Sequence, residues 1–131
     1  MIRVPSPLDD ETEAYVFKTM ECGFEVHKAI GPGYGEPIYE NAFRVELLER
    51  KIPFECQKSF VVKYRDKPVG VHRLDLIVRA RVVVELKAVK ALERVHEAQV
   101  LAYLKASQLP VGLLMNFGGA TLKEGLRRII R

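Results

Sequence analysis

The sequence lacks the features that would place it outside the cell or in a membrane. Its only two cysteines, Cys22 and Cys56, stand far apart and form neither a CxxC pair nor a Cys/His spacing typical of a metal site. The N-terminal residues do not form the basic and apolar regions of a secretory signal peptide. No apolar run approaches the roughly 20 residues that span a bilayer. We therefore expect a reduced, cytoplasmic protein with no membrane partner.

Low-complexity segments, internal repeats and convincing linkers are absent as well. A chain of 131 residues without them is expected to form a single domain, residues 1–131, with one proper core. The composition, 48% hydrophobic and 29% charged, is typical of a globular protein. The formal net charge of +4 favours a polyanionic partner only mildly, because many basic proteins bind nothing acidic.

The most informative stretch runs from His72 to Lys87 and predicts two apolar strands joined by a basic turn. Three ionisable residues, Asp75, Glu85 and Lys87, occupy positions where such strands normally carry apolar side chains. Because side chains alternate along a strand, we expect a charged face and an apolar face. The charged face comprises Arg73, Asp75 and Ile77 on the first strand with Val83, Glu85 and Lys87 on the second. The apolar face, which should line the core, comprises Leu74, Leu76, Val78, Val82, Val84 and Leu86.

The length of the turn decides whether the two carboxylates meet. With an odd loop, residues 79–81, Val78 pairs with Val82, and Asp75 lies opposite Glu85. A two-residue turn would send the carboxylates to opposite faces. We therefore predict an odd loop or a bulge, although no glycine is present to ease it.

Two neighbouring carboxylates repel each other unless a cation lies between them. A hard divalent ion, Mg²⁺ or Mn²⁺, prefers such oxygen ligands, and Lys87 would point at the same place and orient an attacking water. The alternative is a salt-bridged hairpin in which Arg73 and Lys87 simply neutralise the acids. The surrounding runs of Val, Ile and Leu favour the metal site, because buried charges need partners or a metal.

The rest of the chain supplies helices and further strands. Helices are expected at residues 9–30, 37–51, 92–106 and 121–130, and further strands at 60–64, 69–78 and 111–117. The strand after the third helix should return to the sheet by a crossover and make the sheet mixed. Helices on both sides of the meander then give an α/β fold of three layers.

Two helical positions carry alternatives. Pro37 suits the first position of a helix, so Glu36 is either the N-cap residue or a ligand that points into the site, and spacing alone favours the cap. His96, Gln99 and Tyr103 share one face of the helix at residues 92–106. Such a stripe is more often a partly buried polar seam than a catalytic one.

With these residues placed, the sequence resembles the PD-(D/E)XK nuclease superfamily. The similarity is closer to the GxxExxY family within it, and it covers nearly everything except the first dozen or so residues. It is carried by VHKAIGP at 26–32, GYGEPIY at 33–39, RLDL at 73–76, VELKA at 84–88, VHEAQ at 95–99 and NF at 116–117. The resemblance implies a restriction-endonuclease-like core of helix, three-stranded antiparallel meander, helix and strand, with a mixed central sheet and flanking helices.

The resemblance also implies roles for individual residues. Glu36 would approach the metal from the first core helix, and Lys87 would be the catalytic lysine. Gln99 and Tyr103 resemble a QxxxY element that positions the site or the substrate in related nucleases. The metal ligands would be Asp75, Glu85 and the carbonyl of Leu86, with Glu36 as a further ligand.

The function that follows is hydrolysis of phosphodiester bonds by a nuclease that depends on Mg²⁺ or Mn²⁺. DNA is the favoured substrate and RNA the less favoured one. Arg73, Arg79 and Arg81 are candidates to hold the phosphate backbone, although surface arginines are as often merely solvated. The alternatives are a non-catalytic module that binds nucleic acid or protein, and a metal enzyme with another substrate. A chain this small also leaves room for a homodimer or a protein partner.

Overall fold

A computed structural model describes residues 6–131. The elements, in chain order, are α1 (Asp10–Ile30), α2 (Glu36–Glu49), β1 (Phe54–Tyr64), β2 (Lys67–Val78), β3 (Val82–Lys87), α3 (Arg94–Ser107), β4 (Val111–Asn116), the short 3₁₀ helix η1 (Lys123–Gly125) and β5 (Leu126–Ile130). The strands form one sheet in the order β1-β2-β3-β4-β5. β3 and β4 run parallel and all other neighbours antiparallel, which confirms the predicted mixed sheet.

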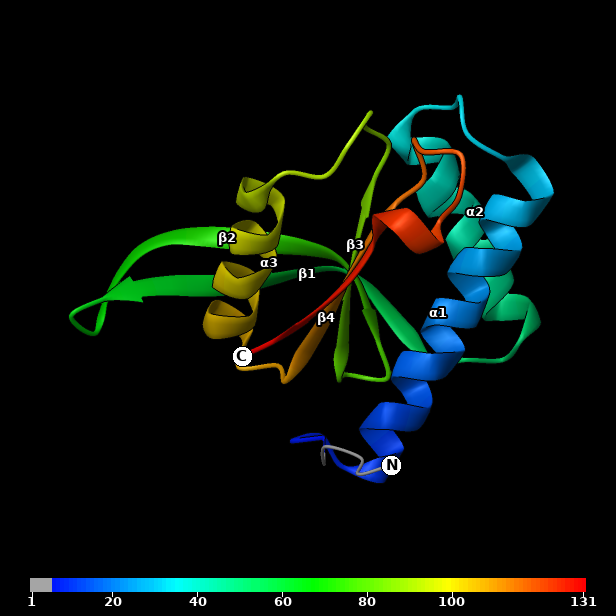
Figure 1. Cartoon of the computed structure of the whole chain (residues 1–131). Helices are drawn as coiled ribbons and strands as arrows, with labels where there is room; N and C mark the ends of the chain where they lie inside the picture. The colour runs from blue at the N-terminus through cyan, green and yellow to red at the C-terminus, as the bar shows by residue number, and fades with distance from the viewer. Residues whose placement is uncertain (1–5) are drawn as a thin grey trace.

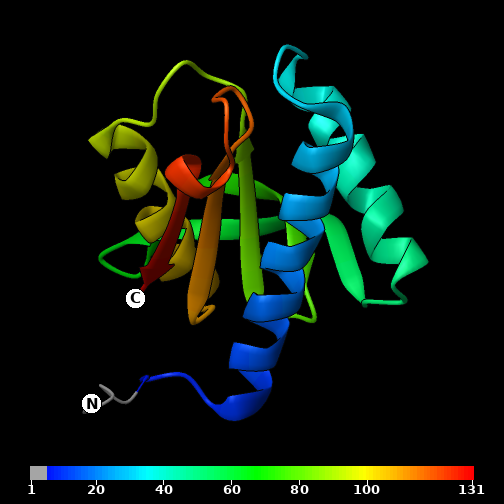
Figure 2. The ribbon, with the colours of Figure 1, turned by 45° about the vertical axis from the view of Figure 1, so that its right-hand side comes forward.

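The sheet lies between two helical layers, as Figures 1 and 2 show: α1 and α2 cover one face, and α3 covers the other. Two apolar clusters correspond to the two faces. The larger joins residues of α1 and α2, such as Val16 and Phe43, to the β3 residues Val82 and Val84. The smaller joins Val100 of α3 to Ile77, Val83 and other residues of the sheet. The predicted α/β fold of three layers is thus confirmed. None of the helices between residues 6 and 131 combines the length and apolarity needed to cross a membrane.

The C-terminal segment differs from its prediction. The helix expected at residues 121–130 is wrong, because the chain forms only the short η1 and then continues as β5, antiparallel to β4 from Met115↔Leu126 to Val111↔Ile130. The free edge of β4 offers backbone groups that need partners, and the β-branched Ile129 and Ile130 suit a pleated surface. Pairing with the sheet therefore outweighs local helix formation.

The apolar face predicted for the first strand of the hairpin, which is β2, is also wrong at one residue. Leu76 and Val78 pack in the larger cluster, but Leu74 packs in the smaller one, beside α3. The β1–β2 ladder skips Gln57 and Asp75, and Gln57 has a positive φ of 58°. The register is the same on both sides of this gap, Cys56↔Leu76 and Lys58↔Leu74, so the change of side between Leu74 and Leu76 is a local distortion of the strands without a register shift.

Candidate active site

The site lies where β2 and β3 separate. The two strands pair at Val78↔Val82 and Ile77↔Val83, on either side of a three-residue loop, and this confirms the predicted odd turn. The part of β2 that precedes Ile77 turns away from β3 and stays paired with β1. β3 continues beside β4 to Lys87 (Figure 1). The predicted pairing of Asp75 opposite Glu85 is wrong, because the β2–β3 ladder ends at Ile77↔Val83 and the two residues lie on opposite sides of the resulting fork. The carboxylates therefore flank an opening in the sheet instead of forming a ladder pair.

Glu85 and Lys87 form the most buried charged pair of this opening. Their side chains are 16% and 21% exposed, and Lys87 Nζ lies 3.5 Å from Glu85 Oε1. Burial raises the pKa of Glu85 to about 7, against the opposing effect of Lys87, and the charges of Asp75 and Glu36 raise it further. The carboxylates of α2, β2 and β3 are therefore close enough to repel one another electrostatically.

Glu36 brings an acid from α2 to the same place. The interpretation of Glu36 as the N-cap residue is wrong: Gly35 occupies that position with extended backbone angles, and Glu36 is the first residue of the helix. Because Gly35 has no side chain, no side-chain hydrogen bond caps this helix. The Glu36 carboxylate is therefore left to face the fork, where its charge raises the pKa of Glu85 and Glu40.

Tyr39 fixes the loop that delivers Glu36. Its fully buried ring stacks on Phe117 with centroids 4.7 Å apart. Its hydroxyl donates to the Gly31 carbonyl at 2.6 Å and accepts from the Tyr34 N–H at 3.2 Å. The final tyrosine of the GYGEPIY segment thus anchors the start of α2 and does not itself reach the acids.

Glu40 is a fourth acid that the sequence analysis missed. It lies one helical turn after Glu36, so the i, i+4 spacing on α2 was the available signal. Burial and the charges of Asp75 and Glu36 raise the pKa of Glu40, while Arg44 opposes them. One turn further along α2, the Arg44 Nε is buried and has no hydrogen-bond partner among residues 6–131.

The opposite wall belongs to α3. Tyr103 is partly buried, and burial followed by the charges of Glu85 and Asp75 raises its pKa. Its ring stacks on His72 of β2 with centroids 4.0 Å apart, a contact that no sequence signal indicated. Gln99 is exposed one turn earlier, and its side chain makes no hydrogen bond within residues 6–131. His96 has a structural role, because its Nδ1 accepts from the Glu93 N–H at the start of α3.

The chain beyond Lys87 is held by Asn116 at the end of β4. The buried Asn116 amide accepts from the Val89 N–H and donates to the Val89 carbonyl, both at 2.9 Å. Gly118 adds its N–H to the same oxygen at 3.1 Å, and a Cβ there would meet the Val89 carbonyl oxygen at 2.1 Å. This clamp fixes the segment that leaves β3 after Lys87.

A family model of the PD-(D/E)XK nuclease superfamily matches residues 13–129. The chain belongs to this superfamily. Searches of curated proteins and of solved structures found no match. The match reaches from within α1 into β5 and includes the whole fork between β2 and β3. The fold and the nuclease superfamily therefore agree.

PD-(D/E)XK nucleases generally use divalent metal ions, and the acids that would bind such an ion lie at the fork. In the described part of the chain, no three His, Cys, Asp or Glu side chains converge closely enough to hold an ion. The donors have the right chemistry, since carboxylate and carbonyl oxygens are what Mg²⁺ and Mn²⁺ prefer. They also repel one another electrostatically, which a cation would relieve. The residue types at the fork therefore fit a divalent metal ion. The ligand set of Glu36, Asp75, Glu85 and the Leu86 carbonyl stays a prediction.

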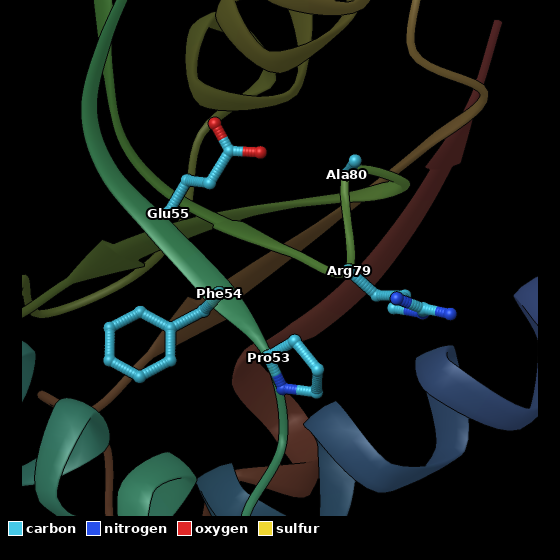
Figure 3. A pocket seen from close by; sticks show the side chains of 5 residues that line it. All are labelled: Pro53, Phe54, Glu55, Arg79 and Ala80. Carbon is cyan, nitrogen blue, oxygen red and sulfur yellow. The ribbon is translucent and has the colours of Figure 1, made fainter.

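The three arginines expected to hold phosphate lie at two ends of the hairpin. Arg73 is 61% exposed and its Nε lies 3.7 Å from Asp75 Oδ1. Arg79 and Arg81 lie in the loop before β3 and form ion pairs at the start of α1, both with Glu11. Figure 3 shows the Arg79 side chain directed toward α1, beside a pocket lined by Pro53, Phe54, Glu55 and Ala80. Their contact with nucleic acid stays a prediction.

Proposed function

We propose that this chain is a nuclease that hydrolyses phosphodiester bonds in DNA with the help of Mg²⁺ or Mn²⁺. The observation that carries the proposal is the buried Glu85–Lys87 pair, set at the fork within reach of the charges of Asp75 and Glu36. A buried acid whose pKa is raised by neighbouring acids is characteristic of functional sites. The resemblance of residues 33–39 to the GxxExxY family, a cytoplasmic location and action on DNA instead of RNA belong to the same proposal.

The side chains at the fork have separate tasks. Asp75, Glu85, Glu36 and the Leu86 carbonyl would hold the ion, which supplies positive charge that stabilises the phosphate during attack. Lys87 orients the attacking water and adds its charge to the phosphoryl oxygens as negative charge develops. Tyr103 and Gln99 line the approach from α3, where Tyr103 positions the substrate beside Glu85.

A non-catalytic module that binds nucleic acid is the alternative. The lack of three converging ligands among residues 6–131 favours it. The buried Glu85 beside other acids argues against it, because such repulsion destabilises a fold that gains nothing from it. Cleavage decides between the two.

The test incubates the protein with linear and circular duplex DNA, single-stranded DNA and RNA, each with Mg²⁺, Mn²⁺ or EDTA. Glu85→Ala and Lys87→Ala should each lower the cleavage rate by roughly 100-fold or more, as expected when a group that stabilises the transition state is removed. Glu49→Ala and Lys51→Ala are matched controls, because they repeat the Glu-x-Lys spacing at exposed positions around the end of α2. Circular dichroism of each variant verifies folding.

Two results would overturn the proposal. One is the absence of cleavage of every substrate with either metal. The other is cleavage that persists undiminished in both Glu85→Ala and Lys87→Ala. Cleavage of RNA alone would show that the substrate is RNA and not DNA, and the proposed phosphodiester hydrolysis would still hold.

A further inference from the structure

Beyond the fork, β1 and β2 continue as a two-stranded arm. Their ladder runs from Lys58↔Leu74 to Tyr64↔Lys67. Figure 1 shows these strands projecting past α3, away from the helices on the other side of the sheet. Every residue from 61 to 71 is exposed. We call residues 58–73 the arm.

The arm carries the excess positive charge of the chain. Residues 58–73 hold five Lys or Arg side chains against a single acid, Asp66, which gives a net charge of +4. The whole chain also has a formal net charge of +4, so the remaining residues balance to zero. The basic residues of the arm are Lys58, Lys63, Arg65, Lys67 and Arg73. A net charge concentrated on one projecting element attracts a polyanion far more than the same charge spread evenly.

The charges toward the tip are available to a partner. Within residues 6–131, Lys63 and Lys67 form no ion pair, whereas Arg81 and Arg128 are tied to acids of the α1 region. The tip residue Arg65 lies over the Tyr64 ring at 5.6 Å and leaves its guanidinium at the surface. The turn also holds Arg65 and Asp66 at positive φ, 50° and 64°, where glycine or asparagine is usual.

Apolar side chains lie among these charges. Val61, Val69 and Val71 are 48%, 61% and 69% exposed, and Val61 and Val71 are direct partners across the ladder. Exposed apolar surface that is rimmed by charge marks an interaction site. The major groove of DNA is complementary to such a surface, because the base edges in the groove carry methyl groups and phosphates line both sides of the groove.

The arm is continuous with the fork. Val71 and Arg73 lie two residues apart on β2 and so share a face, and Arg73 contacts Asp75 through an Nε–Oδ1 distance of 3.7 Å. The neighbouring His72 points to the other side and stacks on Tyr103. A molecule held along the exposed face of the arm would therefore lead directly to the acids.

We propose that the arm docks into the major groove of duplex DNA and delivers the backbone to the fork. The proposal rests on the proposed function and narrows its substrate to duplex DNA. From Lys67 to Arg73 the strand is about 20 Å long, close to six base-pair steps. The B-DNA major groove admits a two-stranded ribbon, while the deep, narrow major groove of duplex RNA does not.

The test measures binding without cleavage. Fluorescence anisotropy in EDTA compares a labelled DNA duplex with the RNA duplex of the same sequence, at several salt concentrations. Lys63→Gln with Lys67→Gln should weaken DNA binding roughly tenfold at 0.1 M salt and lower the slope of log K against log salt by about 2. The matched control, Lys18→Gln with Lys51→Gln, removes two exposed charges from the α1–α2 side. It should change neither the affinity nor the slope.

Each outcome decides the proposal. A DNA preference over duplex RNA that depends on the arm supports it, whether or not the protein also cleaves. Equal affinities and slopes for the arm and control variants, or equal binding of DNA and RNA duplexes, overturn it even if cleavage is observed. A second copy could instead cover the valines: Val71→Asp would then abolish a dimer in light scattering and leave DNA affinity unchanged, which also overturns the proposal.

Discussion

At the scale of single residues, the buried charge of Glu85 at the fork lowers the stability of the fold. Glu85 is mostly buried within an apolar strand, and its only ion pair within residues 6–131 is the 3.5 Å contact with Lys87. Asp75 and Glu36 oppose its ionisation further. Tyr39 and Asn116, by contrast, are buried polar residues with their hydrogen bonds satisfied, and they hold the loops on either side of the site.

Glu85→Gln should therefore stabilise the protein without divalent ions, and increasingly so at higher pH. The pKa of Glu85 is about 7 in the folded chain against 4.5 for a free side chain, so unfolding releases its proton. The stability of the unmodified chain falls as the pH rises from about 4.5 to 7, and glutamine removes that loss. We expect a gain on the order of 2–3 kcal/mol at pH 8 and little gain at pH 4.5.

Urea unfolding in EDTA at pH 4.5, 6 and 8 measures this difference. Glu49→Gln, at an exposed position on α2, should change the free energy of unfolding little and equally at every pH. A gain for Glu85→Gln that does not vary with pH would contradict the burial of an ionisable carboxyl.

At the scale of elements, the β2–β3 turn and the fork are linked. The three-residue loop sets the register of Val78↔Val82 and Ile77↔Val83, the two pairs at which β2 and β3 meet before they separate. It does so with Arg79 and Ala80 both at a φ of 53°, a region that costs residues other than glycine about 1 kcal/mol or more. The loop is therefore held by its surroundings, including the bond from the Arg79 N–H to the Pro53 carbonyl at 2.9 Å.

Ala80→Gly should leave the free energy of unfolding unchanged or raise it by up to about 1 kcal/mol, because glycine adopts a positive φ without strain. Ala14→Gly, at an exposed position within α1, should lower it by about 1 kcal/mol. Thermal and urea unfolding of the two variants make the comparison. If both lose stability equally, the turn does not have the backbone geometry described.

At the scale of the whole molecule, β5 forms one edge of the sheet and packs against both apolar clusters. Leu126 and Ile130 pack against the larger cluster, while Ile129 packs against the smaller one. Arg128 ties the strand to Glu13 of α1. The C-terminal strand thus connects both faces of the sheet and covers the edge of β4.

A chain that ends at Gly125 should lose several kcal/mol of stability, because three aliphatic side chains lose their burial. It should also aggregate through the exposed edge of β4. Circular dichroism melting and light scattering measure both effects. Arg128→Gln in the full chain should cost no more than about 1 kcal/mol, because that ion pair is partly exposed. A truncated chain that melts like the full one would show that β5 contributes little.

The sequence by itself determined the local features. Side-chain alternation placed Asp75, Glu85 and Lys87 on strands, glycine and proline marked the ends of α1 and α2, and the odd loop followed from requiring the carboxylates to share a face. These predictions succeeded because propensity and alternation act between residues close in the chain. The superfamily was also evident from the ordered motifs.

Only the tertiary structure decided how these pieces meet. β2 pairs with β3 only at Val78↔Val82 and Ile77↔Val83, while the rest of β2 pairs with β1 and the whole of β3 pairs with β4. Glu40 and His72 reach the site through packing between elements far apart in the sequence. The last segment became a strand because β4 offered an open edge. Such outcomes arise from competition among distant backbone and side-chain groups, which no local pattern encodes.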